Sequence, residues 1–314
     1  MVEILNLRAG YRFRKKVVRA VNNVCLKIHD QDFLGIAGES GCGKSTLVLA
    51  MLRLLKSPGY IESGKVLING LDIFSLSNEQ LSKVRWKEFS FVPQSSMSSL
   101  NPVMKIKDQI ADAIVCHTDM ERQEAYEIVG EVLKLVGIPV ERANSYPHQL
   151  SGGMRQRVVI AMALALSPKF VVFDEPTTAL DVVVQRSILE KIFELQEQKK
   201  FSAAFVTHDI SLLFEISKHL AIMYAGEIVE YGDTRNVYEN PLHPYAKGLI
   251  EALPSVSGEL KEYKSIPGRP PDLSIVIEGC PFYERCRFRK KICLEKHPEY
   301  KQVEQGRWVS CHLY

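Results

Sequence analysis

An α/β fold built around a parallel sheet is predicted by three observations in this sequence. Short apolar stretches at residues 170–173, 203–207 and 219–224 have the length and composition of buried strands. Helical patterns alternate with them, which is typical of parallel sheets. A further apolar stretch begins at Phe33 and runs into a glycine-rich turn, as expected where a strand leads into a ligand-binding loop.

Size and composition exclude several classes of protein. The 314 residues are 46% hydrophobic and 25% charged, which fits neither a disordered nor a fibrous chain. The longest strictly apolar run has nine residues, from Val158 to Leu166, whereas a membrane helix needs roughly 20. We therefore expect no membrane span, and because the N-terminus lacks the apolar stretch of a signal peptide, we expect a cytoplasmic location. A net charge of +3 is too small to indicate a nucleic-acid partner.

The segment FLGIAGESGCGKST, which starts at Phe33, predicts a strand, a turn and the start of a helix. It fits the phosphate-binding pattern G-x-x-x-x-G-K-[ST], in which backbone N–H groups and a helix start converge on phosphate oxygens. Lys44 would reach the β- and γ-phosphates of a nucleotide, and the Ser45 hydroxyl would ligate Mg²⁺. The loop residues expected to contact ATP are Gly38, Glu39, Ser40, Gly41, Cys42, Gly43, Lys44, Ser45 and Thr46.

Two carboxylates end the strand in KFVVFDEPTTALD, which begins at Lys169. The carboxyl end of a buried strand is where open α/β sheets bind ligands. Asp174 would hold Mg²⁺ directly or through water, and Glu175 would polarise the water that attacks the γ-phosphate. The alternative is an acid pair that faces solvent, and the phosphate loop elsewhere in the chain argues against it.

A second anion site is predicted in LSGGMRQRVVIAMALAL, which begins at Leu150. Ser151, Gly152 and Gly153 lie at a helix start, where free N–H groups attract anions. Two phosphate-binding helix starts for one nucleotide make sense if the second contacts ATP held by another subunit.

With these motifs the chain resembles the ATP-binding subunits of ABC transporters, for which the LSGGM signature is highly specific. The remaining motifs of that family match in order. The resemblance implies that Tyr11 stacks on adenine, that Gln94 in FVPQ senses Mg²⁺ and the attacking water, and that His208 in FVTHD contacts the γ-phosphate. It also implies that Leu180 and Asp181 link the two nucleotide sites of a dimer.

Three further segments are similar to the ATPases of the oligopeptide, dipeptide and nickel importers. They are QSSMSSLNPVMKIKDQI from Gln94, NPLHPYAKGLIEALP from Asn240 and IPGRPPDL from Ile266. This resemblance covers essentially the whole chain. It implies a P-loop NTPase fold with a parallel core, an antiparallel β subdomain, a helical subdomain and a small cysteine-rich tail domain.

The organisation expected along the chain is an ABC ATPase domain over residues 1–240 and a C-terminal extension over residues 241–314. Within the first, residues from about 91 to 160 are expected to be helical. An apolar residue every three or four positions predicts an amphipathic helix there, on Ala125, Ile128, Val129, Val132, Leu133 and Val136. Prolines beyond residue 240 break regular structure, which marks a linker into the tail.

Four of the seven cysteines lie in the last 35 residues. Cys280, Cys286, Cys293 and Cys311 are spaced C-x5-C-x6-C-x17-C, which lacks the close pairs that structural zinc sites prefer. Iron–sulfur clusters take four thiolates at other spacings. A mixed zinc site that includes His312 and a set of unligated thiols remain alternatives.

The resemblance favours the cluster among these alternatives, because peptide importers with a similar GCPFYERC tail bind a 4Fe–4S cluster. We expect the cluster to act as a staple for a tail with few apolar residues, and redox sensing is the other interpretation. Residues 280–314 carry eight Lys/Arg against four Asp/Glu. The basic residues between the cysteines are expected to offset thiolate charge or to face solvent.

The function expected is ATP hydrolysis that drives solute import. The implied partners are ATP, two transmembrane permeases, a second ATP-binding subunit and, indirectly, an extracytoplasmic solute-binding protein, with the chain at the cytoplasmic face of the membrane. Two rivals remain: a soluble ABC ATPase acting on nucleic acid or ribosomes, and an iron–sulfur ATPase under redox control. The first usually carries long coiled-coil insertions or tandem cassettes, and this sequence has neither.

Overall fold

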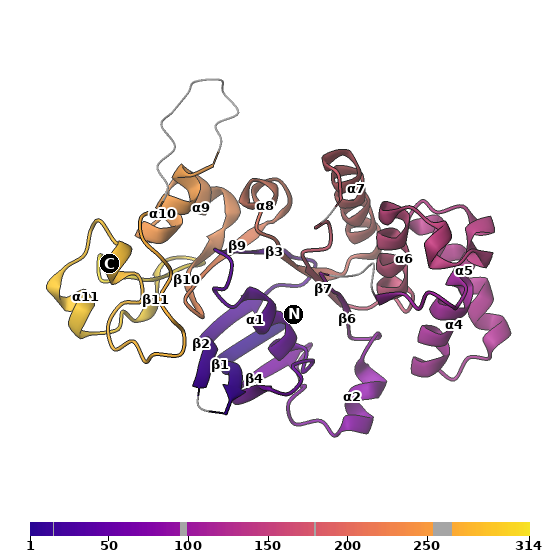
Figure 1. Cartoon of the computed structure of the whole chain (residues 1–314), viewed down its shortest axis with the longest axis horizontal. Helices are drawn as coiled ribbons and strands as arrows, with labels where there is room; N and C mark the ends of the chain where they lie inside the picture. Colours follow the sequence, from indigo (N-terminus) through magenta and orange to yellow (C-terminus); the bar gives the residue numbers. More distant parts are fainter. Residues whose placement is uncertain (15, 95–98, 179, 254–265) are drawn as a thin grey trace. The chain divides into compact units, whose positions relative to one another are not determined.

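The computed structural model describes the whole chain of 314 residues except residues 15, 95–98, 179 and 254–265 (Figure 1). The described residues form two compact units. The first unit comprises residues 1–28, 32–74 and 205–314, and the second comprises 29–31 and 75–204. Strand β8 (Ser202–Val206) crosses the boundary between them. The division into domains at residue 240 stays a prediction, although the first unit contains residues from both sides of it.

The N-terminal part of the first unit is an antiparallel sheet with the strand order β2-β1-β4-β5. Its strands are β1 (Val2–Phe13), β2 (Lys16–Ile28), β4 (Gly59–Ile68) and β5 (Leu71–Asp72). Helix α1 (Lys44–Met51) packs against β1, β2 and β4. An antiparallel β sheet, as the family resemblance implies, is therefore present, and the helix predicted after the glycine-rich turn begins at Lys44.

A second sheet in the first unit contains the strand that leads into the phosphate loop. Part of it has the order β11-β12-β10-β9-β3, and β3 and β9 are parallel. The strands are β3 (Phe33–Ala37), β9 (His219–Tyr224), β10 (Glu227–Asp233), β11 (Tyr300–Glu304) and β12 (Arg307–Ser310). All five residues of β3 are buried. Because β12 pairs with β10, the C-terminal tail adds strands to the same sheet as the phosphate-loop strand.

Short helices complete the first unit. The α-helices after β8 are α8 (Ile210–Ile216), α9 (Thr234–Glu239), α10 (Pro244–Glu251) and α11 (Lys291–Glu295), and η3 (Tyr283–Arg285) is a 3-10 turn. Pro244 is the first residue of α10, where a missing N–H costs nothing, and the His243 side chain accepts a hydrogen bond from the Tyr245 N–H. The proline-rich region beyond residue 240 thus contains a capped helix as well as irregular chain.

The second unit is mainly helical. The helical subdomain expected over residues from about 91 to 160 stays a prediction. The second unit also contains the parallel strands β6 (Phe89–Val92) and β7 (Phe170–Asp174). Its described α-helices are α2 (Asn78–Val84), α4 (Ile106–His117), α5 (Arg122–Leu135), α6 (Gly152–Leu164) and α7 (Val182–Lys199), with 3-10 turns η1 (Val140–Asn144) and η2 (Pro147–Gln149). Helix α5 is the predicted amphipathic helix, and it packs against α4 and α6. Its buried residues are Ala125, Val129, Val132 and Leu133.

Helix length and composition also decide whether a helix could span a membrane. Within the described part of the chain, we find no helix that is both long and apolar enough to span a bilayer. The longest of the described helices, α7, has 18 residues, of which six are charged.

Candidate nucleotide-binding site

The phosphate loop connects β3 to α1 through three glycines with positive φ. Gly38, Gly41 and Gly43 have φ angles of 155°, 80° and 110°. A Cβ atom on Gly43 would lie 2.0 Å from the carbonyl oxygen of Ala20, and one on Gly38 would lie 2.2 Å from that of Met223. Larger residues are therefore excluded at both positions by backbone contacts as well as by conformation. Gly43 is also the N-cap of α1. Because glycine has no side chain, it makes no capping hydrogen bond to the first N–H groups of that helix.

Lys44 is held inside this loop. Its side chain is buried, and its Nζ donates hydrogen bonds to the carbonyl oxygens of Gly38 at 2.7 Å and Glu39 at 3.0 Å. These bonds hold an ammonium group against the loop backbone at the start of α1, the place where phosphate is expected. Cys42 is buried beside it, and burial raises the pKa of its thiol. Because a protonated thiol is a poor nucleophile, Cys42 fits a packing role better than redox control.

The two other predicted nucleotide contacts of the first unit are Tyr11 and His208. The Tyr11 hydroxyl lies 3.2 Å from the Thr46 hydroxyl, so this half-buried ring is brought to the end of the phosphate loop. His208 is exposed after β8, and the next residue, Asp209, caps α8 by accepting a hydrogen bond from the Leu212 N–H. The stacking role of Tyr11 and the phosphate contact of His208 stay predictions.

The second unit brings the predicted catalytic residues together at the carboxyl end of β7. Asp174 is the last residue of β7 and is buried. Glu175 Oε2 accepts a hydrogen bond of 2.7 Å from Gln94 Nε2 and one of 3.0 Å from the Thr178 hydroxyl. Glu175 has a φ of 46°, a conformation that costs energy for a residue with a side chain and is common at functional sites. Gln94, which follows β6, and Thr178, in the turn after β7, thus fix the carboxylate of Glu175, which is expected to act on water.

The signature segment forms the start of α6 in this unit. Ser151 is the N-cap, and its hydroxyl accepts a hydrogen bond from the Met154 N–H. A Cβ atom on Gly153 would lie 2.5 Å from Val184 Cγ1, so glycine allows α6 to approach the start of α7 closely. Asp181 caps α7 by accepting a bond of 2.9 Å from the Val184 N–H. Ser151, Gly152 and Gly153 are exposed or half-buried, so their polar groups remain accessible.

All four tail cysteines are half-buried thiols in the first unit. The Cys280 N–H donates a hydrogen bond of 2.7 Å to the carbonyl oxygen of Cys293, which joins two of them through the backbone. Burial, and to a smaller extent the three other thiols, raise the pKa of Cys280 to about 12. Burial likewise raises the pKa of Cys286 and of Cys311. The three other thiols contribute to the raised pKa of Cys280, after burial as the main cause.

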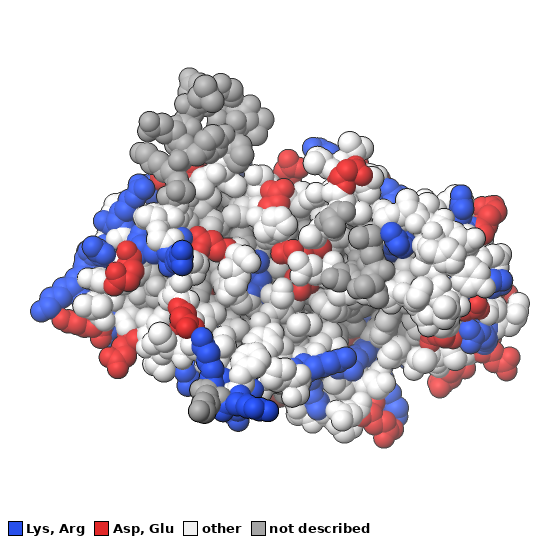
Figure 2. All heavy atoms as spheres, viewed as in Figure 1, with Lys and Arg blue, Asp and Glu red and all other residues white. Residues whose placement is uncertain are grey.

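Backbone groups point at these sulfur atoms. The N–H groups of Phe282, Phe288 and Leu313 lower the pKa of the thiols two residues before them, and the Lys290 N–H donates to the sulfur of Cys293. Such N–H bonds stabilise thiolates in metal centres. Among the residues that the structure describes, however, no group of three or more His, Cys, Asp or Glu side chains is arranged to hold a metal ion. Figure 2 shows basic side chains gathered over the C-terminal tail, at the left of the view, with acidic ones between them.

Sequence reasoning missed several residues that contact the predicted site. Thr178 lies in the stretch EPTTALD, and its bond to Glu175 depends on a turn whose shape the sequence does not specify. Tyr245 and Arg285 contact the phosphate loop from the C-terminal region. Arg285 departs from the expectation for basic residues between the cysteines, because it is buried in an ion pair with Glu39. Part of the QSSMSSLNPVMKIKDQI segment, at 95–98, lies outside the described residues.

Comparisons with known proteins bear on both parts of the chain. The model of the ABC transporter family matches residues 21–178, and that of the oligopeptide/dipeptide transporter C-terminal region matches residues 229–293. A dipeptide transport ATP-binding protein of Caldanaerobacter subterraneus subsp. tengcongensis is 40% identical, covering 100% of this chain and 97% of that protein. An oligopeptide transport ATP-binding protein of Bacillus subtilis is also 40% identical, covering 100% and 88%.

Solved structures agree with the family assignment. A dimeric bacterial ABC transporter cassette superposes with a TM-score of 0.67 at 30% identity, covering 75% of this chain and 99% of the cassette. A dimeric cassette in a post-hydrolysis state bound to ADP and Pi superposes with a TM-score of 0.66 and the same coverage. The predicted α/β fold of a P-loop ATPase is therefore confirmed. The chain belongs to the ABC transporter ATP-binding subunits, of the oligopeptide/dipeptide transporter type.

Proposed function

We propose that this chain is the ATP-hydrolysing subunit of a membrane importer for peptides or a related solute. The observation that carries the proposal is the similarity along the whole chain to transport ATP-binding proteins named for dipeptides and oligopeptides. That similarity includes the C-terminal region, which a shorter cassette lacks. The reaction is the hydrolysis of ATP to ADP and phosphate, and its free energy drives uptake.

The roles of the site residues follow from their chemistry. The loop N–H groups and Lys44 bind the phosphates, and Ser45 and Asp174 would hold Mg²⁺, which neutralises phosphate charge when it is bound. Glu175 accepts a proton from the attacking water as general base. Gln94 donates a hydrogen bond of 2.7 Å to Glu175, so its amide orients the carboxylate.

A second ATP-binding subunit completes the site in this proposal. Ser151 and Gly153 of one subunit would contact the nucleotide held by Lys44 of the other, because the start of α6 offers a helix N-terminus with accessible groups. Two solved relatives of the cassette type are dimers, which supports this arrangement. The helical second unit would meet the two permeases at the cytoplasmic face, and a solute-binding protein would deliver the cargo to them from outside.

We propose further that the tail cysteines bind a 4Fe–4S cluster. The backbone hydrogen bond that joins Cys280 to Cys293 and the N–H group of Lys290 at the sulfur of Cys293 support it. The cluster would crosslink the segments of this short tail that contain the four cysteines. Anaerobic purification followed by iron, sulfide and zinc analysis tests the assignment. Iron and sulfide lost on Cys286→Ser but kept on Cys116→Ser, at an exposed cysteine, would support it, whereas one zinc per chain would replace it with the zinc alternative.

Transport is tested with the chain co-purified with its permeases in lipid vesicles. We expect ATP hydrolysis that rises when the permeases, the solute-binding protein and peptide are all present, together with accumulation of labelled peptide inside the vesicles. Glu175→Gln is the matched control, since it leaves the assembly intact. Hydrolysis that responds to nucleic acid or ribosomes and ignores the permeases would favour the soluble ATPase instead.

A further inference from the structure

The cysteine-rich tail contacts the phosphate loop directly, through one arginine. Arg285, between Cys280 and Cys286, donates from both terminal nitrogens to the two carboxylate oxygens of Glu39, each at 2.8 Å. Glu39 is the second residue of the phosphate loop and lies 246 residues away in sequence. The side chain of Arg285 is only 5% exposed and that of Glu39 is 26% exposed. Paired N–H bonds of this kind fix orientation as well as distance, and lysine cannot reproduce them.

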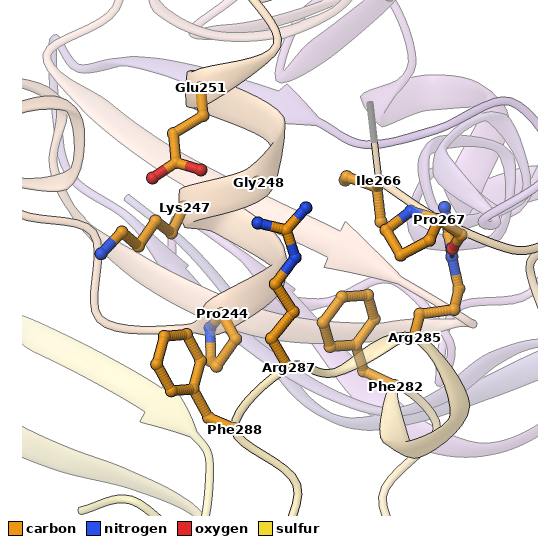
Figure 3. Close-up of a pocket in the computed structure, with 10 residues that line it drawn as sticks. All are labelled: Pro244, Lys247, Gly248, Glu251, Ile266, Pro267, Phe282, Arg285, Arg287 and Phe288. Atoms are coloured by element: carbon orange, nitrogen blue, oxygen red, sulfur yellow. Dashed lines mark hydrogen bonds between the residues drawn. The ribbon is translucent and has the colours of Figure 1, made fainter. Parts of the chain in front are cut away.

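Arg285 is itself fixed by groups other than Glu39. Its Nε donates to the carbonyl oxygen of Pro267 at 2.8 Å, and its guanidinium lies 5.7 Å and 5.9 Å from the ring centroids of Tyr224 and Phe282. Figure 3 shows Arg285 beside Phe282 and Pro267 on the wall of a cavity of about 190 Å³. The arginine is therefore held by the tail and the core sheet, and it can hold the glutamate in turn.

Glu39 is contacted through every polar group it has. Its carboxylate binds Arg285, its N–H donates to the Tyr245 hydroxyl at 2.8 Å, and its carbonyl oxygen accepts from Lys44 Nζ. Tyr245 is fully buried in α10 and packs against Tyr224, with ring centroids 4.5 Å apart. A continuous set of buried contacts thus runs from the cysteine segment to the ammonium that is expected to meet the phosphates.

The charge of Glu39 gives the contact a consequence for nucleotide binding. A carboxylate in the phosphate loop repels the phosphates of ATP unless a cation neutralises it. Without Arg285 the carboxylate would be free to take Lys44 as its partner, and that would withdraw the lysine from the nucleotide. We propose that Arg285 is a positioning residue for ATP binding: it neutralises and orients Glu39, and so keeps the loop and Lys44 ready for phosphate. The inference uses the phosphate site proposed above and extends it to the tail.

Equilibrium binding of a fluorescent ATP analogue to the full chain tests this role, with steady-state ATPase assays on the assembled transporter beside it. We expect Arg285→Gln to raise Kd and KM about 10- to 100-fold, the scale on which misplaced binding groups act, and to leave kcat nearly unchanged. Arg285→Lys should fall between, because one contact can be kept. Arg287→Gln is the matched control, since Arg287 lines the same cavity but is exposed, and it should bind like the wild type.

A double-mutant cycle separates this role from simple loss of tail stability. If the pair acts as a unit, Glu39→Gln combined with Arg285→Gln should bind ATP no worse than Arg285→Gln alone, because the repelling charge is gone. Wild-type affinity in Arg285→Gln, or effects of the two changes that multiply, would overturn the proposal. Should Arg285→Gln fail to fold, the same titration of Arg285→Lys, alone and combined with Glu39→Gln, tests the proposal instead. Wild-type affinity in Arg285→Lys, or effects of the two changes that multiply, would then overturn it. Retained binding in Lys44→Ala would instead refute the phosphate site itself, whatever the arginine variants show.

Discussion

Replacement of Glu175 by glutamine changes the carboxylate that we propose as the general base, and little else. Oε2 of Glu175 accepts two hydrogen bonds, from Gln94 at 2.7 Å and from Thr178 at 3.0 Å. A glutamine carbonyl oxygen at the same position accepts both bonds, so the shape of the site is retained. What is lost is the negative charge and the ability to take a proton from water. The free energy of unfolding should therefore change by no more than about 0.5 kcal/mol.

The size of the kinetic effect follows from the role of a general base. A positioned base contributes about 10²- to 10⁴-fold to a rate, which corresponds to about 3–5 kcal/mol of activation free energy. Binding of ATP does not use the lost charge, and one negative charge fewer near the phosphates favours binding. We therefore expect kcat to fall by about 10²-fold or more while Kd for ATP stays the same or decreases.

Phosphate release by the reconstituted transporter measures the first effect, and size-exclusion chromatography with ATP and Mg²⁺ measures the second. The variant should accumulate as a nucleotide-bound dimer, because closed subunits no longer separate by hydrolysis. Glu190→Gln on the exposed side of α7 is the matched control, and it should behave as the wild type. Hydrolysis by Glu175→Gln at the wild-type rate would refute the role of Glu175 as general base. It would also refute the role of Gln94 in orienting that carboxylate.

Three other predictions follow from the structure. Lys44→Ala removes the only side-chain ammonium that we place in the phosphate loop, and it should abolish detectable ATP binding in the same fluorescence titration. Arg307→Met leaves the carboxylate of Glu230, which is 0% exposed, without its cation, and urea denaturation should show a loss of about 3–5 kcal/mol; a loss below about 1 kcal/mol would contradict this. The bond to Glu227 raises the pKa of His297, so the stabilisation it contributes is complete below the unfolded pKa of about 6.5 and is lost as the pH rises through the folded pKa. A thermal denaturation profile from pH 5 to 9 should therefore fall at the alkaline end, and His297→Gln should remove that fall.

The parts of the site that the sequence predicts are those encoded by neighbouring residues. The phosphate loop depends on glycines at fixed spacing and on a helix that begins at Lys44, and all of these are local features. The acid pair at the end of β7 is local in the same sense, since a buried strand ends at Asp174. Strand limits were predicted to within a residue or so: β8 covers Ser202–Val206, where residues 203–207 were expected.

Contacts between distant segments are what the sequence does not predict. The bond between Gln94 and Glu175 joins residues 81 positions apart, and the pair of Arg285 and Glu39 joins residues 246 positions apart. An arginine among lysines and arginines in a basic tail has no local feature that marks it as buried. Its partner is chosen by the aromatic packing of the tail on the core sheet, which is a property of the folded chain as a whole.

The pairing of β12 with β10 has a consequence for how long the polypeptide must be. Glu230 lies opposite Val309 and Tyr231 opposite Trp308, so the last residues of the chain cover an edge of the sheet that holds the phosphate-loop strand. A premature stop codon or a protease cut before β12 would leave the backbone groups of β10 open to pairing with another chain, a common start of aggregation. The closing strands therefore protect the sheet against edge-to-edge association as well as completing it.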